Sequence, residues 1–451
     1  MFQSSTEDRS DRPRVCVIGA GSSGITACQN LDERGVEFSC FEKGSDVGGI
    51  WRYRNDNGMS AAYRSLHINT SREMMEYSAF PMPVDYPDYP GHAEIAAYFE
   101  DFVDHFGLRD RIEFNTEVVS VEPVESGWMV TVEGPEGRRT ESFTDVMVCN
   151  GHHWNPRWPE PAFPGADGFT GEQIHSHDYK TPEILEGKTV LILGIGNSAT
   201  DIAVESSRVA DRTLLAMRRG AWIVPKYIFG IPTDRLTTFA PMTRMPLGVQ
   251  SAMMRLTLRL TQGRITDSGL PMPDHRPLHA HPTVSDELLG RLGHGDITVK
   301  PNIDRFEGGT VFFEDGSSED VDVVIFCTGY RITFPFLDSS VIDVTDNQVE
   351  LYKRVVPVDR PGLYFIGLVQ PLGPIMPLSE AQASWVADLI AGQGALPDRS
   401  EMARDIALER SAMDRRYVSS KRHTIQVDFD RYLRTIGRER RRSRDRVRLP
   451  A

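Results

Sequence analysis

Two glycine-rich turns constrain the fold of this chain more than any other feature. The first, "GAGSSG" at 19–24, follows the apolar run "RVCVI", and the second, "GIGNSA" at 194–199, follows "TVLIL". In such a turn the first glycine permits the tight bend and the second lets a pyrophosphate approach the backbone, while a small third residue allows close helix packing. A helical pattern and another strand follow each turn, so both segments predict parallel β-α-β units that bind dinucleotides.

The residue that ends the second strand differs between the two units. Glu42 ends it in the first, where a carboxylate can bind ribose hydroxyls. Arg218 stands at the equivalent place in the second, where a cation suits a 2′-phosphate. FAD in the first unit and NADPH in the second satisfy both preferences. The alternative for Arg218 and its neighbour Arg219 is a solvated arginine pair at a strand end.

The order of strands and helices predicts an α/β fold with two Rossmann-like dinucleotide-binding domains. We expect a discontinuous FAD-binding domain at 1–163 and 320–451, with the NADPH-binding domain inserted at 164–319. After the first unit, "IEFNTEVVSVEP", "GWMVTVEG" and "FTDVMVCNG", all within 112–151, predict antiparallel strands. Prolines throughout 152–168 indicate a linker.

Two segments carry patterns that the paired motifs do not explain. The insertion around 221–295 contains "VQSAMMRLTLRLTQ" at 249–262, an apolar stripe that predicts a surface helix. Because a methionine-rich stripe is more often buried, we favour packing or a lid role over membrane contact. The arginine run Arg438–Arg448 predicts a solvated, frayed terminus rather than a surface for nucleic acid or membrane.

Composition excludes several classes of function. The 451 residues carry a formal net charge of -14, which argues against nucleic acid as a main partner. Five cysteines occur without a C-x-x-C pair, so we expect neither a dithiol redox centre nor a metal site. Cys16, Cys149 and Cys327 lie in apolar runs and are expected to be small buried side chains. The polar first residues and the lack of a long apolar stretch predict a cytoplasmic protein without a transmembrane segment.

On its ordered motifs the sequence resembles the flavin-containing monooxygenases, which are class B flavoprotein monooxygenases, in their eukaryotic-type form. The resemblance runs from about Arg14 to about Asp428. The family signature F-x-G-x-x-x-H-x-x-x-Y is matched by Phe169, Gly171, His175 and Tyr179. Further matching segments are "EKGSDVGGIW" (42–51), "NTSREMM" (69–75), "VCNGHH" (148–153), "GIGNSATDIA" (194–203), "CTGY" (327–330) and "GLVQPLGPIMP" (367–377).

The resemblance implies which residues touch the cofactors. For FAD they are Gly19, Ala20, Gly21, Ser22, Ser23, Gly24, Glu42, Ile50, Trp51, Asn69 and Thr70. For NADP they are Ile68, Asn69, Gly194, Gly196, Ser198, Ala199, Thr200, Asp201 and Arg218. Asn69 would be the catalytic residue, with its amide near both the flavin and the nicotinamide. Taken alone, an asparagine in such a segment is an ordinary turn residue.

The signature stretch "FTGEQIHSHDY" at 169–179 has the composition of an active site, with two histidines and a tyrosine. Oxygen transfer to a soft nucleophile needs no protein base, however. In the resembling family this stretch lies at the hinge between the NADP and FAD domains. We therefore interpret it as a structural switch rather than as the catalytic centre.

The implied activity consumes NADPH and O₂. NADPH reduces FAD, and a C4a-hydroperoxyflavin then passes one oxygen atom to an amine nitrogen or a sulfide sulfur. One alternative is Baeyer–Villiger oxidation of ketones, although that signature usually has Trp where Tyr179 stands. A disulfide reductase would need the C-x-x-C that is absent, and a non-enzymatic NADPH and FAD redox sensor is the third alternative. The resemblance also allows a homodimer, and it leaves the substrate open.

Overall fold

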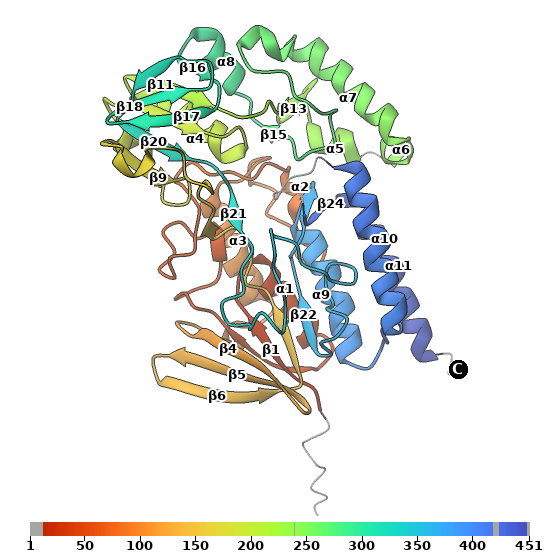
Figure 1. Ribbon diagram of the computed structural model, residues 1–451. Helices are drawn as coiled ribbons and strands as arrows, with labels where there is room; N and C mark the ends of the chain where they lie inside the picture. The colour runs from red at the N-terminus through yellow and green to blue at the C-terminus, as the bar shows by residue number, and fades with distance from the viewer. Residues whose placement is uncertain (1–11, 239, 418–423, 449–451) are drawn as a thin grey trace, which may run out of the picture.

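The computed structural model describes residues 12–238, 240–417 and 424–448 (Figure 1). Two five-stranded parallel sheets organise the chain, as the paired β-α-β units predict. The first sheet has the order β22 (Leu363–Phe365), β7 (Asp145–Val148), β1 (Arg14–Ile18), β2 (Glu37–Phe41) and β3 (Ile112–Glu113). The second has the order β16 (Ile297–Lys300), β11 (Arg212–Ala216), β10 (Thr189–Leu193), β20 (Val323–Phe326) and β9 (Glu172–His175).

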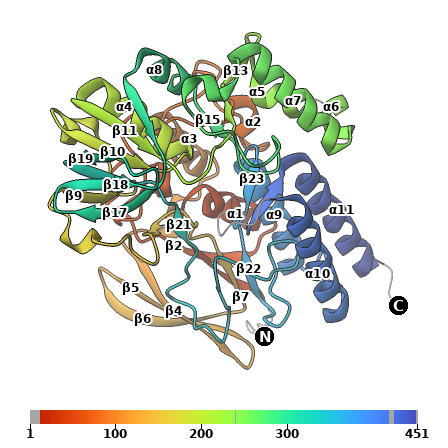
Figure 2. The same ribbon diagram turned by 45° about the horizontal axis from the view of Figure 1, so that its top comes forward.

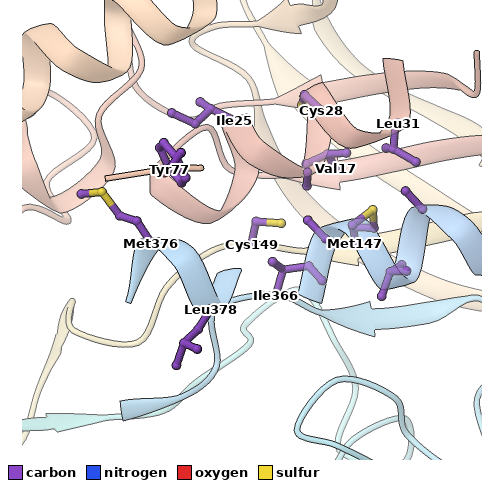
Figure 3. Packing of buried hydrophobic residues seen from close by; sticks show 14 of the residues in the cluster. Val17, Ile25, Cys28, Leu31, Tyr77, Met147, Cys149, Ile366, Met376 and Leu378 are labelled. Atoms are coloured by element: carbon purple, nitrogen blue, oxygen red, sulfur yellow. The ribbon is translucent and has the colours of Figure 1, made fainter. Parts of the chain in front are cut away.

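Helices pack on the first sheet because their apolar positions recur every three or four residues. On α1 (Ser22–Asp32), Ile25, Cys28 and Leu31 form one buried face. That face and α9 (Met376–Ile390) meet in one core with the strands of the sheet (Figure 3). Helix α3 (His92–His105) also contributes to this core. On the second sheet α4 (Asn197–Val209) and α8 (Leu288–His294) contribute to a separate core.

The segment 112–151 is only partly the predicted antiparallel sheet. That sheet contains β4 (Glu117–Val124), β5 (Gly127–Gly134) and β6 (Gly137–Phe143). The prediction for "FTDVMVCNG" is wrong, since it contains β7, which pairs in parallel with β1 in the first sheet. Its last three residues are all buried, and this unbroken apolar run is typical of a parallel strand covered on both faces.

The chain crosses between the two sheets twice, and the two crossings lie side by side. β8 (Asn155–Pro156), in the predicted linker, pairs antiparallel with β21 (Tyr330–Arg331). The domain boundary predicted between 319 and 320 falls too early, because β20 pairs with both β10 and β9 in the second sheet. A small antiparallel sheet packs against the second sheet and comprises β17 (Ile303–Glu307), β18 (Thr310–Phe313) and β19 (Ser318–Asp320).

The insertion around 221–295 is largely helical and lies beyond the edge of the second sheet (Figure 1). Besides α8, its helices are α5 (Thr233–Thr238), α6 (Ala240–Arg244) and α7 (Leu247–Gln262). Its short strands pair as β12 (Ile223–Val224) with β15 (Thr283–Val284) and β13 (Tyr227–Ile228) with β14 (Ile231–Pro232). The predicted surface helix is confirmed as α7. The expectation that its apolar stripe is buried is wrong in part, because one stripe is exposed and consists of Val249, Met253, Leu256 and Leu260.

The C-terminal segment is built into the fold. α10 (Arg399–Arg416) and α11 (Phe429–Arg448) lie side by side next to α9 in both views (Figures 1 and 2). Between them β24 (Gln426–Asp428) pairs in parallel with β23 (Gln370–Leu372). The predicted frayed end at Arg438–Arg448 is therefore wrong. Glu439 and Ser443 are buried, and Arg440 and Arg444 pair with the buried Asp388 of α9. Single turns complete the fold at α2 (Arg72–Met75), Gly49–Trp51, Arg109–Arg111, Ala166–Gly168, Pro182–Leu185 and Ile265–Ser268.

Candidate cofactor and active site

Residues of both glycine turns line one cavity of about 1230 Å³. Each turn follows the carboxyl end of a central strand, β1 or β10, and opens a helix, α1 or α4. The binding crevice of parallel α/β sheets lies at this end of the strands. The structure thus brings the two predicted nucleotide sites, far apart in sequence, to one space.

The first turn has a backbone that only glycine can adopt. Gly19 has a φ of 94°, and a Cβ added there would lie 3.1 Å from the Cys149 carbonyl oxygen. At Gly24 an added Cβ would lie 1.8 Å from the Gly19 carbonyl oxygen. Gly21, which precedes α1, lines the cavity together with Ser22. Because no side chain caps α1, its first N–H groups and positive dipole end are available to an anion, so this cradle fits a pyrophosphate.

Glu42 has a structural role beside its predicted one. Its carboxylate is buried and accepts hydrogen bonds of 2.7 Å from the backbone N–H groups of Ala20 and Gly44. The Asn57 amide also donates to it, at 3.2 Å. The carboxylate therefore joins the glycine turn to the loop after β2. Glu42 also lines the cavity, and its Oε2, which accepts one hydrogen bond from Ala20, can accept a further one from a ribose hydroxyl.

The segments 50–51 and 68–70 bring the other predicted flavin-side residues to the same cavity. Ile50, Trp51, Ile68, Asn69 and Thr70 all line it. Ile68 and Thr70 are buried, whereas Asn69 between them is partly exposed. No hydrogen bond joins the Asn69 side chain to another described residue, so its amide is available to a ligand in the cavity.

Both turns match the prediction in part, because Ala20 and Gly24 of the first turn do not line the cavity. Gly196, Ser198 and Ala199 line the cavity, but Gly194 does not. Gly194 has a φ of 138°, and an added Cβ would lie 2.8 Å from the Cys327 carbonyl oxygen, so its role is to shape the turn.

Two residues predicted to contact NADP are bonded elsewhere. The Thr200 hydroxyl is buried and donates to the Asn197 carbonyl at 2.9 Å, within α4. The Asp201 carboxylate accepts a hydrogen bond of 2.5 Å from the Tyr63 hydroxyl. Neither lines the cavity. Their neighbour Asn197, which the sequence reading omitted, does line it, and its side-chain oxygen accepts from the Val284 N–H at 2.9 Å.

The Tyr63–Asp201 pair joins the flavin-side segment to α4. Burial raises the pKa of Asp201 to about 6, although the hydrogen bond from Tyr63 opposes this rise. Burial also raises the pKa of the Tyr63 hydroxyl, and the nearby Asp201 charge adds to the effect. Tyr63 therefore stays protonated and donates.

Arg218 follows β11 at the predicted place but lies outside the cavity lining. Its side chain is exposed, and no ion pair to it occurs among the described residues. Arg219 differs, since it lies 3.6 Å from the Asp274 carboxylate. Of the two arginines, Arg218 is therefore the one whose charge is available to a 2′-phosphate at the rim, and this contact stays a prediction.

None of the four signature residues lines the cavity. Their contacts hold the edge strand β9 in position instead. The Phe169 ring packs 5.0 Å from the Phe306 ring, and an added Cβ at Gly171 would lie 2.7 Å from the Asp322 carbonyl oxygen. His175 is fully buried, and burial lowers its pKa to about 4. The Tyr179 hydroxyl donates to Glu205 of α4 at 2.6 Å. A neutral, enclosed histidine agrees with a structural role.

Sequence reasoning expected the insertion to contribute to the pocket but did not identify its lining residues or the part of the wall formed by the C-terminal segment. The insertion contributes Leu236, Met242, Met245, Met253, Met254 and Leu278, and α11 contributes Phe429, Arg431 and Arg434. The methionine-rich stripe of α7 was the available signal: it predicted the helix but not which face would meet the cavity. Among the described residues no helix has the length and apolarity needed to cross a bilayer.

Comparisons with known proteins show which family the chain belongs to. The family model described as "FMO-like: Flavin-binding monooxygenase-like" matches residues 12–440. Flavin-containing monooxygenase 5 of Homo sapiens is 42% identical over 434 residues, covering 93% of this chain and 81% of that protein. Dimethylaniline monooxygenase [N-oxide-forming] 2 of Rattus norvegicus is 38% identical over 441 residues, covering 94% and 82%.

Solved structures show the same fold. S-allyl-L-cysteine S-oxygenase from Allium sativum superposes with a TM-score of 0.71 at 28% identity, covering 97% of this chain and 92% of that one. A steroid monooxygenase bound to NADP has a TM-score of 0.71 at 18% identity, covering 96% and 98%, and shows the likeness of fold alone. The chain therefore belongs to the family of flavin-containing monooxygenases, enzymes that use FAD and NADPH.

Proposed function

We propose that this enzyme transfers one oxygen atom of O₂ to a soft nucleophile, either an amine nitrogen or a sulfide sulfur. The observation that carries the proposal is the single cavity shared by both glycine turns, Asn69 and the apolar wall of the insertion. The names of two relatives, an N-oxide-forming monooxygenase and an S-oxygenase, support this choice of nucleophile.

We infer that the first glycine turn and Glu42 hold the adenosine and pyrophosphate of FAD, and that the turn at 194–199 holds NADPH. The glycine geometry and the uncapped N-terminus of α1 fit such a ligand. When bound, FAD supplies the redox chemistry that activates O₂ with electrons from NADPH. The protein supplies binding, orientation and exclusion of water.

Asn69 is the residue that we propose to act at the reacting centre. A side-chain amide can donate and accept hydrogen bonds at the same time, so it can orient two ligands that meet beside it. The buried neighbours Ile68 and Thr70 limit the movement of its backbone. The signature histidines are excluded from this role because neither His175 nor His177 lines the cavity.

The cavity wall favours a substrate with an apolar body. Four methionines of the insertion line the cavity, and their flexible thioether side chains adapt to apolar groups of different shape. A wall of this kind also keeps water away from the reacting atoms, which strengthens the polar contacts made there. We therefore propose amines and thioethers with sizeable apolar substituents as the substrate class.

The test combines cofactor analysis with product analysis. Purified protein should be yellow and should release FAD on denaturation. It should then be incubated with NADPH and a panel of tertiary amines, thioethers and ketones, with NADPH loss, hydrogen peroxide and oxygenated product measured together. N-oxides or S-oxides in step with NADPH loss would support the proposal. Ketone oxidation alone would favour the Baeyer–Villiger alternative, and NADPH loss without any oxygenated product would contradict both.

A further inference from the structure

A carboxylate of the insertion reaches the segment that carries Asn69. Asp234 lies on α5, and one of its oxygens accepts two hydrogen bonds of 2.7 Å, from the backbone N–H and from the hydroxyl of Ser71. Ser71 is the residue that precedes α2, and its own side chain does not cap that helix. Figures 1 and 2 show α5 next to α2. Asp234 therefore holds the start of α2 in place through Ser71, which lies two residues after Asn69 in the chain.

The Asn69 side chain has no partner of its own among the described residues, so its position depends on the backbone around it. On one side, the Ile68 N–H donates to the Pro90 carbonyl at 3.0 Å. On the other side, the Ser71 N–H donates to Asp234. Ile68 and Ser71 are both almost fully buried. These two anchors enclose Asn69, and only the second comes from the insertion.

From this arrangement we propose that Asp234 is a positioning residue that holds the Asn69 amide in place. The inference rests on the proposed role of Asn69. A hydrogen bond to a charged acceptor is stronger than one between neutral groups, and Asp234 provides two of them to a buried residue. A small shift of a group beside the reacting atoms can reduce product formation greatly. The insertion thus controls the geometry of the reacting centre as well as the apolar wall.

Two variants of Asp234 separate hydrogen bonding from bulk and charge. Asp234→Asn keeps the shape and one side-chain oxygen, which can still accept from both Ser71 groups. Asp234→Ala removes the acceptor. Arg235→Ala is the matched control, because it breaks the neighbouring ion pair with Glu73 between the insertion and α2 and leaves the contact with Ser71 intact.

The first readout is hydrogen exchange of the backbone amides in a peptide covering residues 68–75, measured without turnover. In Asp234→Ala the Ser71 amide should exchange about tenfold faster than in the wild type, since it loses its acceptor. Asp234→Asn should exchange faster than the wild type but slower than Asp234→Ala, because its neutral oxygen is a weaker acceptor, and Arg235→Ala should exchange at the wild-type rate. Wild-type exchange in Asp234→Ala would overturn the proposal.

The second readout is the fate of the electrons from NADPH. Asp234→Ala should retain FAD and oxidise NADPH, while oxygenated product per NADPH falls about tenfold and hydrogen peroxide rises to match. Asp234→Asn should lose less coupling than Asp234→Ala, because its side-chain oxygen still accepts, and Arg235→Ala should keep the wild-type coupling. An Asp234→Asn variant as uncoupled as Asp234→Ala, or an equally uncoupled Arg235→Ala, would also overturn the proposal.

Asn69→Leu, assayed beside the Asp234 variants, separates the proposed role of Asn69 from the proposed anchoring role of Asp234. If Asn69→Leu remains coupled, the proposed role of Asn69 fails, whereas the exchange result still decides whether Asp234 anchors this segment. Should Asp234→Ala fail to fold, Ser71→Ala carries the test, because it removes one of the two hydrogen bonds and keeps the backbone one. It should give a smaller loss of coupling than Asn69→Leu, and full coupling in Ser71→Ala would count against the proposal.

Discussion

Asp388 joins the C-terminal helix α11 to the core of the first sheet, and replacing it with asparagine should destabilise the protein. Its carboxylate is fully buried on α9. It accepts hydrogen bonds of 2.8 Å from Arg34 Nε, 2.6 Å from Arg440 Nε and 2.8 Å from Arg444 Nε. Two of these arginines belong to α11, so one carboxylate is shared by three cations and holds the helix in place.

The size of the effect follows from the pKa of this carboxyl group. Burial alone would raise the pKa, but the hydrogen bonds from the three arginines lower it from 3.8 to about 2. A difference of this size corresponds to about 2 kcal/mol of stability for the ionised form. Asparagine also leaves the arginines without their counter-charge, which adds to the loss. We expect Asp388→Asn to lower the free energy of unfolding by about 3 kcal/mol at pH 7.

The pH dependence has a definite sign. Because folding lowers the pKa, the ionised carboxylate stabilises the fold above pH 4, and this contribution is lost as the pH falls from about 4 to about 2. Asparagine does not titrate, so the stability difference between wild type and Asp388→Asn should be constant from pH 7 to pH 5. It should then narrow below pH 4.

The assay is urea unfolding followed by far-ultraviolet circular dichroism, with FAD in excess for every variant. Arg441→Ala is the control, since Arg441 lies on the exposed face of α11 and has no ion pair among the described residues. It should change the free energy of unfolding by less than about 0.5 kcal/mol. The reasoning is refuted if Asp388→Asn costs no more than Arg441→Ala.

Three further predictions concern the cofactor site. Arg218→Ala should raise the KM for NADPH about 10- to 100-fold and leave the KM for NADH unchanged, because a charge-assisted contact to the 2′-phosphate is lost. An equal change for both cofactors, or the same selective effect in Arg219→Ala, would assign the contact to another residue. Asn69→Leu should retain FAD and consume NADPH while releasing hydrogen peroxide in place of product, which coupled product formation would disprove. Tyr63→Phe removes the donor that stabilises ionised Asp201, whose pKa is about 6. The loss of thermal stability caused by this substitution should therefore be larger at pH 8 than at pH 5.5. An equal loss at both pH values would contradict this assignment.

Local patterns were sufficient to predict the parts of the fold that are encoded locally. The turns at 19–24 and 194–199 need particular backbone angles and close approaches, and these requirements are visible in the sequence as glycines. The alternation of strand and helix then predicts two parallel sheets. β7 was misassigned because a short buried run has the same apolar composition in a parallel or an antiparallel sheet.

The site could be predicted only where it follows directly from the turns. Thr200 is a residue of the matched segment, but its hydroxyl bonds within its own helix, and the sequence gives no sign of that. Asp234 is 163 residues from Ser71 in the chain, and their contact depends on how the insertion packs. The same holds for Asp388 and Arg444, whose pairing turns an arginine-rich terminus into a structural helix.

The insertion and the C-terminal segment, which carry no nucleotide motif, both line the cavity. α7 of the insertion contributes Met253 and Met254, and α11 contributes Phe429 and Arg434. The insertion also bonds to the second glycine turn, where the Thr283 hydroxyl donates to the Ile195 carbonyl at 2.5 Å and the Val284 N–H donates to the Asn197 side-chain oxygen at 2.9 Å. The first turn, which we propose holds FAD, therefore depends mainly on its own backbone geometry, whereas the second turn and the cavity wall also depend on long-range contacts of the insertion and α11. We expect changes in those long-range contacts to alter the proposed preference among nucleophiles while the first turn keeps its geometry.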